Sequence, residues 1–416
     1  MDALSAALAV GLGSLVGLAT GLVPGLHVNT LVALTAGLLP VAGPHAALGL
    51  VAVGVVHTFV GILPATYLGA PGDDTALVVL PAHRLLQEGF GPGAVHLSAH
   101  ASLLALVLAV ALVLPYKWLL LEPGRGLERL DAATPLLVAG VIVLLVLQER
   151  LRGRRAVLGA ASVLGLSGCL GLVAARAPVR ALLDVPATPL LPLLAGLFGL
   201  PALLVALQNG AAVPRQAVLR RPLSRTAPRG TVGATLLGTG AAAWTAVLPG
   251  LTAAVATALT PLPRRDDPRP VVAALSAVNT AHATLALAVL WITGRPRTGL
   301  AQALGGLLPV TAWERGAPPS PLVWVLGAAL AAGILGHLGT LALDRCIAAR
   351  IHRVPPRALN AAGLVLVSGL LVVLSGPVGV MVGAVATLVG LLPLAFGIRR
   401  VHLVGALLVP VLIHAV

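Results

Sequence analysis

A Pro-Gly-Leu triplet interrupts an apolar stretch near the N-terminus and is followed at once by polar side chains. This triplet begins at Pro24, and a second copy begins at Pro249, about half the chain later. Proline removes a backbone donor and glycine lets the chain leave a helix, so each triplet predicts a broken helix. Free backbone amides and the positive end of a helix dipole at such a break favour an anion. The predicted anion-binding residues at the two breaks are Pro24, Gly25, His27, Asn29, Thr30, Pro249 and Gly250.

More polar side chains fall in the middle of the apolar segments that follow the two breaks. They are His57 and Thr58 in the first half of the chain, and Asn279, Thr280 and His282 in the second. A lone threonine in a membrane helix commonly bonds to its own backbone. Clusters in matched positions of two halves are harder to attribute to packing. We therefore predict that these five residues contribute to substrate binding.

Ionisable side chains inside a membrane are costly and are functional candidates by default. Asp73 and Asp74 occupy a break between two apolar segments. Two interpretations stay open there, a carboxylate that binds a cation or proton and a simple helix N-cap. We predict that Asp73, Asp74 and His57 handle a coupling ion, Na⁺ or H⁺. Almost all other acidic residues fall in predicted loops, and His337, on a helix face of small residues, is interpreted as a packing residue.

The motifs of cofactor-dependent and metal-dependent chemistry do not occur in the sequence. It contains no Walker motif, zinc-ligand spacing, nucleophile elbow or haem pattern. Its two cysteines, Cys169 and Cys346, are isolated. We therefore predict no cofactor, no metal site and no enzymatic activity.

The composition indicates that all these residues belong to a membrane protein. Of the 416 residues 58% are hydrophobic and 10% are charged, and the mean hydropathy is +1.01. Soluble domains carry roughly 25% charged residues. The net charge of +14 comes from arginines in predicted loops, where they set topology and meet anionic headgroups, so no nucleic-acid partner is predicted. The predicted fold class is an all-α polytopic integral membrane protein.

Apolar segments recur along the whole chain. They are predicted at about 4–23, 25–40, 46–69, 97–114, 133–148, 156–174, 188–206, 231–248, 250–263, 271–293, 322–343, 358–375, 378–396 and 401–415. Segments 25–40 and 250–263 are short for a full span of about 20 residues. These two segments, which carry the Pro-Gly-Leu motifs, are predicted to be broken or re-entrant helices.

The placement of arginines predicts two inverted repeats. Arginine-rich segments are expected on the cytoplasmic side, and they lie at 150–155, 215–229, 345–357 and 399–400. The first apolar segment has no basic residue before it, so its start is placed outside, whereas the second half starts inside. Opposite orientation of two halves is typical of transporters. We predict a first membrane repeat at 1–210, an Arg-rich cytoplasmic linker at 211–230 and a second membrane repeat at 231–416.

Several short motifs, weak singly but ordered along most of the chain, carry a family resemblance. They are Gly21 to Thr30, Gly69 to Gly89, Ser276 to Ala281 with Gly294 to Gly299, and Gly390 to Gly405. Their order resembles the large permease subunit of the tripartite tricarboxylate transporters, the TctA family, and looks most like its archaeal branch. Two positions depart from the bacterial pattern. His57 to Gly61 replaces a Gly-Gly-Ser tract, and Asn279-Thr280 replaces an Asn-Asn pair.

The resemblance implies a multi-pass permease of the cytoplasmic membrane that carries carboxylates and uses a cation gradient. Bacterial systems of this type add a small membrane subunit and an extracytoplasmic binding protein. The partners expected from the resemblance are therefore the lipid bilayer, a small anionic substrate and two such subunits.

Three functions are weighed. The leading prediction is a secondary transporter that works by alternating access. The first alternative is a translocase for a polyprenyl phosphate or another lipid phosphate, which would need a lateral opening to lipid beside the breaks. The second is a membrane-embedded enzyme acting on lipid, for which Asp73, Asp74 and His83 are the nearest match to a catalytic cluster.

Overall fold

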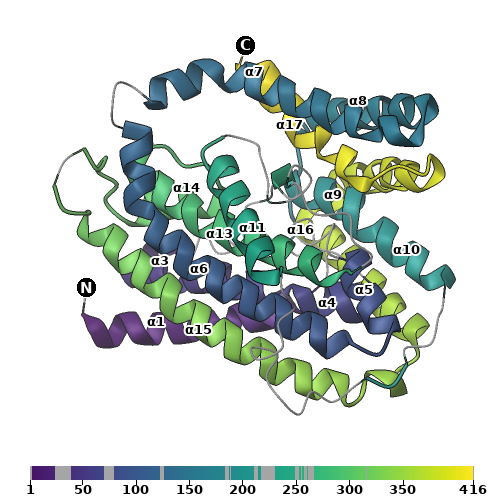
Figure 1. Cartoon of the computed structure of the whole chain (residues 1–416), viewed down its shortest axis with the longest axis horizontal. Helices are drawn as coiled ribbons and strands as arrows, with labels where there is room; N and C mark the ends of the chain where they lie inside the picture. Colours follow the sequence, from purple (N-terminus) through teal and green to yellow (C-terminus); the bar gives the residue numbers. More distant parts are fainter. Residues whose placement is uncertain are drawn as a thin grey trace.

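The computed structural model is built from helices, and the part of the chain that it describes contains no strand (Figure 1). It describes residues 2–23, 39–69, 79–121, 126–182, 187, 189–209, 214–216, 230–248, 253, 255, 256, 260, 267–314 and 316–415. Nine helices in this part are long and apolar enough to cross a membrane. The prediction of an all-α polytopic membrane protein is confirmed.

One group of helices, here called the first bundle, shares one hydrophobic core. Its members pack around α3 and α13: α1 and α15 lie against α3, and α11 and α6 lie against α13. The first bundle consists of α1 (Ala3–Gly21), α3 (Leu39–Val60), α4 (Ile62–Tyr67), α5 (Val79–Gln87), α6 (Gly91–Leu121), α11 (Thr231–Thr245), α13 (Arg269–Thr293), α14 (Gly299–Leu307) and α15 (Ser320–Ala348).

The remaining helices, the second bundle, pack around two further cores. Here α8 lies against α17, and α16 lies against the segment from α9 to α10. The second bundle consists of α7 (Gly126–Leu147), η1 (Gln148–Arg152), α8 (Arg154–Ala175), α9 (Leu190–Leu194), the π-helix η2 (Ala195–Gly199), α10 (Leu200–Asn209), α16 (Pro356–Ala395), η5 (Arg400–Val404) and α17 (Gly405–Ala415). A short 3₁₀ turn, η4 (Ile351–Arg353), precedes α16.

Burial separates the central helices of the first bundle from its outer helices. The spans that contain α3 and α13 are the most buried of the nine, whereas α1 exposes large apolar side chains along its length. Leu4, Leu8 and Leu12 are each more than half exposed. Scattered leucines of this kind on an outer helix suit contact with lipid. Polar residues on α3 and α13 therefore lie inside the protein.

Glycine lets two helix pairs approach closely, in the same way in each half of the chain. A Cβ atom at Gly13 of α1 would overlap the carbonyl oxygen of Gly49 on α3, and one at Gly238 of α11 would overlap that of Ala274 on α13. Helices whose backbones approach this closely need small residues at the crossing. The α1–α3 and α11–α13 pairs thus share the same kind of close crossing.

Two glycines with positive φ break long helices. Gly376 (φ 58°) divides α16 just before Pro377, so the predicted segments 358–375 and 378–396 meet at this kink. Gly43 (φ 69°) bends the start of α3 just before Pro44. Glycine takes this left-handed conformation without the steric penalty that a side chain brings. The Pro-Gly-Leu motifs themselves, at 24–26 and 249–251, lie outside the described residues.

Candidate functional site

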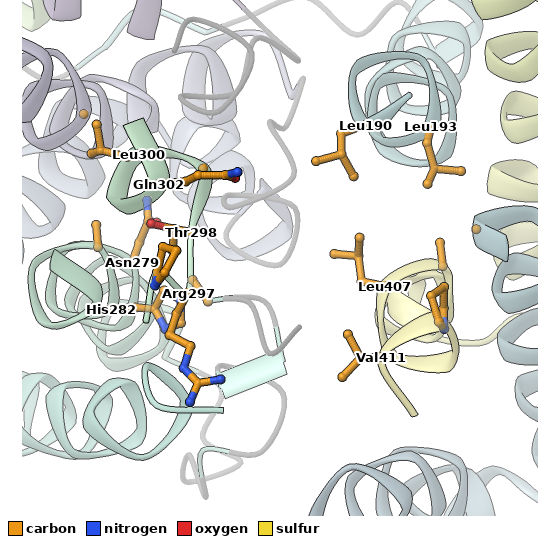
Figure 2. Close-up of a pocket in the computed structure, with 18 of the residues that line it drawn as sticks. Leu190, Leu193, Asn279, His282, Arg297, Thr298, Leu300, Gln302, Leu407 and Val411 are labelled. Atoms are coloured by element: carbon orange, nitrogen blue, oxygen red, sulfur yellow. The ribbon is translucent and has the colours of Figure 1, made fainter. Parts of the chain in front are cut away.

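A cavity of about 500 Å³ lies between the two bundles (Figure 2). Its walls come from α3, α13 and the segment that leads into α14 on one side, and from α8, α9 and α17 on the other. Pockets of roughly 300–1,000 Å³ commonly hold small ligands. The position between separately packed bundles makes this cavity the best candidate for a substrate site.

The wall that belongs to the first bundle is polar. Figure 2 shows its side chains gathered on one side of the cavity. They are Asn279 and His282 of α13, Arg297 and Thr298 ahead of α14, and Gln302 within α14. Asn279 is buried, Arg297 is half-buried, and Gln302 is exposed. The wall therefore offers amide, imidazole, hydroxyl and guanidinium groups to a ligand.

The wall that belongs to the second bundle is apolar. It carries leucine and valine side chains that face the polar wall in Figure 2, namely Leu190, Leu193, Leu407 and Val411. Small residues complete it, because Gly171, Ala174 and Ala175 of α8 also line the cavity. A ligand in this cavity would therefore meet hydrogen-bonding groups on one side and hydrocarbon on the other.

Hydrogen bonds hold the polar wall in place. The hydroxyl of Thr58 on α3 donates to the carbonyl of Val55 at 2.7 Å, so the 3.2 Å bond between Thr58 and Thr280 has Thr280 as its donor. Nδ1 of His282 lies 3.3 Å from the hydroxyl of Thr245 on α11. These bonds tie α3 and α11 to α13 beside the cavity, so the wall is positioned by three helices.

Arg297 and the start of α14 give the cavity a positive character. Thr298 is the N-cap of α14, and its hydroxyl accepts a 3.2 Å hydrogen bond from the backbone amide of Ala301. Of the described residues that line the cavity, Arg297 is the only one with a permanent charge. A guanidinium beside a helix N-terminus favours an anion.

The model of the tripartite tricarboxylate transporter TctA family matches residues 7–405. The chain belongs to this family. It is a member of a transporter family of multi-pass membrane proteins, and the tripartite name refers to systems with further subunits.

A curated relative adds a shorter match. The chain is 36% identical over 104 residues to an uncharacterized protein of Methanocaldococcus jannaschii. This match covers 25% of the chain and 26% of the relative. No solved structure matches the chain significantly.

The structure brings several predicted substrate residues of this TctA-family chain to one place. Thr58, Asn279 and His282 line the cavity. Thr280 binds Thr58 directly, and His57 is the half-buried neighbour of Thr58. Other predicted site residues lie outside the described residues, so their roles stay predictions: Pro24, Gly25, His27, Asn29, Thr30, Asp73, Asp74, Pro249 and Gly250.

The sequence analysis did not single out Arg297, the positively charged side chain that lines the cavity. Arg297 falls in a short loop between two helices, and basic loop residues were assigned to topology and headgroups. Its presence in the motif Gly294 to Gly299 was the available signal. The apolar wall was also missed, because leucines in apolar helices carry no pattern that separates a cavity wall from a lipid-facing surface.

The expectation that acidic residues fall in loops is wrong for two residues. Asp344 was grouped with a loop, but α15 continues to Ala348 and buries the Asp344 side chain. Glu149, beside the predicted cytoplasmic loop, is also fully buried. The burial of both residues was not predicted, because an arginine follows each of them directly in the sequence and indicates a loop.

A single offset of 225 positions relates landmarks in the two halves. It carries Gly13 to Gly238 and Gly49 to Ala274, the two close helix crossings. The same offset carries His57 to His282, and the two Pro-Gly-Leu motifs also differ by 225. These landmarks support the predicted internal repeat, and the Leu-Pro pairs at 39–40 and 262–263, which differ by 223, require a small gap in the alignment.

Proposed function

We propose that this protein is a secondary transporter for a small organic anion, most simply a carboxylate, which binds in the cavity between the two bundles. The observation that carries the proposal is Arg297 in a half-polar cavity at the start of α14. Membership in the TctA family supports the same substrate class.

The residues of the polar wall suit a carboxylate. Arg297 can bind both oxygens of one carboxylate, because a guanidinium presents two parallel N–H donors. The amide of Asn279 and the imidazole of His282 add donors for a second oxygen group. The leucines of the opposite wall would cover the carbon skeleton and exclude water. Polar and apolar walls together would therefore select a small molecule with an anionic and a hydrocarbon side.

The position of the site supports alternating access as the proposed mechanism. The helices of the two bundles pack mainly around different hydrophobic cores, and in the proposed cycle each bundle moves as a unit while the cavity between them opens to one side or the other. The predicted inverted repeats at 1–210 and 231–416 would supply two related states. The offset of 225 positions and the matched helix crossings support this arrangement.

A Na⁺ or H⁺ gradient is the proposed energy source. Asp73, Asp74 and His57 stay the predicted coupling residues from the sequence, and the two Pro-Gly-Leu breaks stay predicted contributors of backbone amides. The extra subunits that the family name refers to would deliver substrate from outside the cell membrane.

Arg297→Gln tests the site. Exchange of citrate, a tricarboxylate probe, would be measured in vesicles reconstituted with the full chain. The apparent affinity for citrate would be taken from this exchange. Loss of charge-assisted hydrogen bonds should weaken citrate binding about 10- to 100-fold. Arg295→Gln is the matched control, because Arg295 is exposed two residues away and does not line the cavity. Equal affinity for citrate in the parent and in Arg297→Gln would contradict the proposal that the cavity is the substrate site.

A lipid-phosphate translocase is the second candidate, and the apolar wall favours it. Leu190, Leu193 and Leu407 could lie along a hydrocarbon chain while Arg297 holds the phosphate. Thermal shifts of the purified protein with citrate and with a short-chain polyprenyl phosphate would separate the two functions. Stabilisation by the polyprenyl phosphate alone, lost in Arg297→Gln, would replace the carboxylate proposal.

A further inference from the structure

A second polar cluster lies inside the first bundle, on residues other than those that line the cavity. At its centre is Asp344 of α15, whose side chain is 2% exposed. Its Oδ1 accepts a 2.6 Å hydrogen bond from the hydroxyl of Tyr67, at the end of α4. Its Oδ2 lies 3.6 Å from Nε2 of His96 on α6. Three helices thus meet at one buried carboxylate.

Two more histidines extend this cluster along α6 and α15. Nδ1 of His100 donates to the carbonyl of His96 at 2.6 Å, and Nδ1 of His337 donates to the carbonyl of Ala99 at 3.1 Å. The rings of His100 and His337 meet edge to face, with centroids 4.8 Å apart. Because Nδ1 is the donor in both rings, Nε2 of each is the atom that can gain or lose a proton.

Nε2 is the ring nitrogen of His96 that faces the carboxylate, 3.6 Å from Oδ2 of Asp344. Nδ1 of His96 is buried and has no hydrogen-bond partner among the described residues. One turn before Asp344 on the same helix, the hydroxyl of Thr340 is buried and lacks a partner in the described part as well. Buried polar groups are normally satisfied, and exceptions concentrate at sites with a chemical role.

The balance of charge in this cluster depends on one proton. The titratable and charged groups around Asp344 are Tyr67 of α4, His96 and His100 of α6, and His337 and Arg345 of α15, while α3, packed on α15, adds His57. Arg345 is exposed. With Asp344 ionised and His96 neutral, the centre carries a buried negative charge, which is costly. One added proton, on Oδ2 of Asp344 or on His96, makes the pair neutral overall.

We propose that Asp344 and His96 form a proton-binding site that takes up and releases one proton during the protein's cycle. Binding forms an O–H bond at Oδ2 of Asp344, and release breaks that bond. His100 and His337 extend the site along the bundle. The described residues contain no group of three or more His, Cys, Asp or Glu side chains arranged to hold a metal ion. One carboxylate beside an imidazole and a tyrosine hydroxyl suits a proton better than a sodium ion, because hard cations take several oxygen ligands.

The proton site is mechanically connected to the cavity. The hydroxyls of Ser276 on α13 and Ser98 on α6 are hydrogen-bonded to each other at 2.7 Å, and Ser102 donates to the carbonyl of Ser276 at 3.3 Å. On the other side, Gly336 of α15 packs against Val56 of α3. The two helices that carry the proton site therefore contact the two helices that carry Thr58 and Asn279. The inference that this contact couples proton binding to transport rests on the proposed function. The inference of the proton site itself does not.

Infrared difference spectroscopy tests the proton site without any substrate. Spectra of the full-length protein in lipid, recorded at two pH values, should contain the C=O stretching band of a carboxylic acid that gains its proton. Asp344→Asn should lack this band and Glu149→Gln should keep it. An unchanged titrating band in Asp344→Asn would overturn the proposal. If Asp344→Asn does not fold, His96→Gln provides the test. An unchanged pH midpoint of the carboxylic-acid band in His96→Gln would also overturn the proposal.

Transport tests the coupling separately. In reconstituted vesicles Asp344→Asn should still exchange citrate across the membrane but should lose accumulation driven by a pH gradient. Accumulation equal to that of the parent would overturn the coupling role. A parent that shows the infrared band but neither exchanges nor accumulates citrate would contradict the proposed function and leave the proton site standing.

Discussion

Among the described residues, each bundle buries one carboxylate, and the two carboxylates differ in whether their partners carry a permanent charge. In the second bundle, Oε1 of Glu149 lies 2.8 Å from Nε of Arg399 and 3.2 Å from Nε2 of His402, and Arg152 lies 3.4 Å from its other oxygen. In the first bundle, Asp344 faces a tyrosine and a histidine. Arginine keeps its charge at every accessible pH, whereas histidine does not.

This difference separates a structural ion pair from a site that can change state. Glu149 is neutralised by arginine at any pH, so it fastens the end of α7 to the turn before α17. Asp344 is neutralised only when a proton is present. Burial alone therefore does not mark a functional acid, and the permanence of its partner's charge is the better criterion.

The largest expected effect is at Glu149. Glu149→Ala leaves Arg399 without its partner and opens a gap at the joint between α7 and η5. Breaking a buried pair costs about 3–5 kcal/mol, and we expect the lower end, about 3 kcal/mol, because the Arg399 side chain is 35% exposed and can be hydrated. Thermal unfolding in detergent would measure this loss. A decrease of less than about 1 kcal/mol in the free energy of unfolding would mean that the Glu149 ion pair contributes no more than an ordinary surface ion pair.

How far the sequence predicts this molecule is clear from particular residues. Hydropathy predicts the helices, because lipid requires every backbone group to be paired within a segment. The polar residues of α3 and α13 could be singled out from the sequence, since Thr58, Asn279 and His282 interrupt apolar spans, and their role in substrate binding stays a prediction. All three line the cavity, but the offset of 225 positions pairs only His282 with a polar residue, His57.

Residues beside charged loops were not predictable in the same way. A hydropathy profile ends a helix where charges begin, but α15 continues through Asp344 and Arg345 to Ala348. Arg297 lies in a loop like any other arginine until the fold turns α14 toward the cavity. Tyr67 and His96 are distant in sequence from Asp344, so only the packing of α4, α6 and α15 reveals their cluster.

The same amide substitution at the two buried carboxylates should give different results. In Asp344→Asn the side-chain oxygen still accepts the hydrogen bond from Tyr67, and no charge needs to be buried. We expect a change of at most about 1 kcal/mol in unfolding free energy, together with loss of the pH dependence of stability that the proton site gives. Glu149→Gln, the matched variant, should lose more stability and keep that pH dependence. A larger loss of stability in Asp344→Asn than in Glu149→Gln would contradict the distinction between a structural ion pair at Glu149 and a proton site at Asp344.

An exposed carboxylate completes the series and should give the smallest effect. Glu88 lies 3.0 Å from Nε of Arg84, one turn earlier, and both side chains are about half exposed. Water already solvates both charges there, so the pair gains little from contact and loses side-chain freedom in making it. Glu88→Gln should therefore change the unfolding free energy by about 0.3 kcal/mol, and added salt should reduce even that difference. Thermal unfolding at low and high salt would measure both quantities. A loss as large as that of Glu149→Ala would mean that burial does not set the value of these ion pairs, and the contrast between Glu149 and Asp344 would then need another cause.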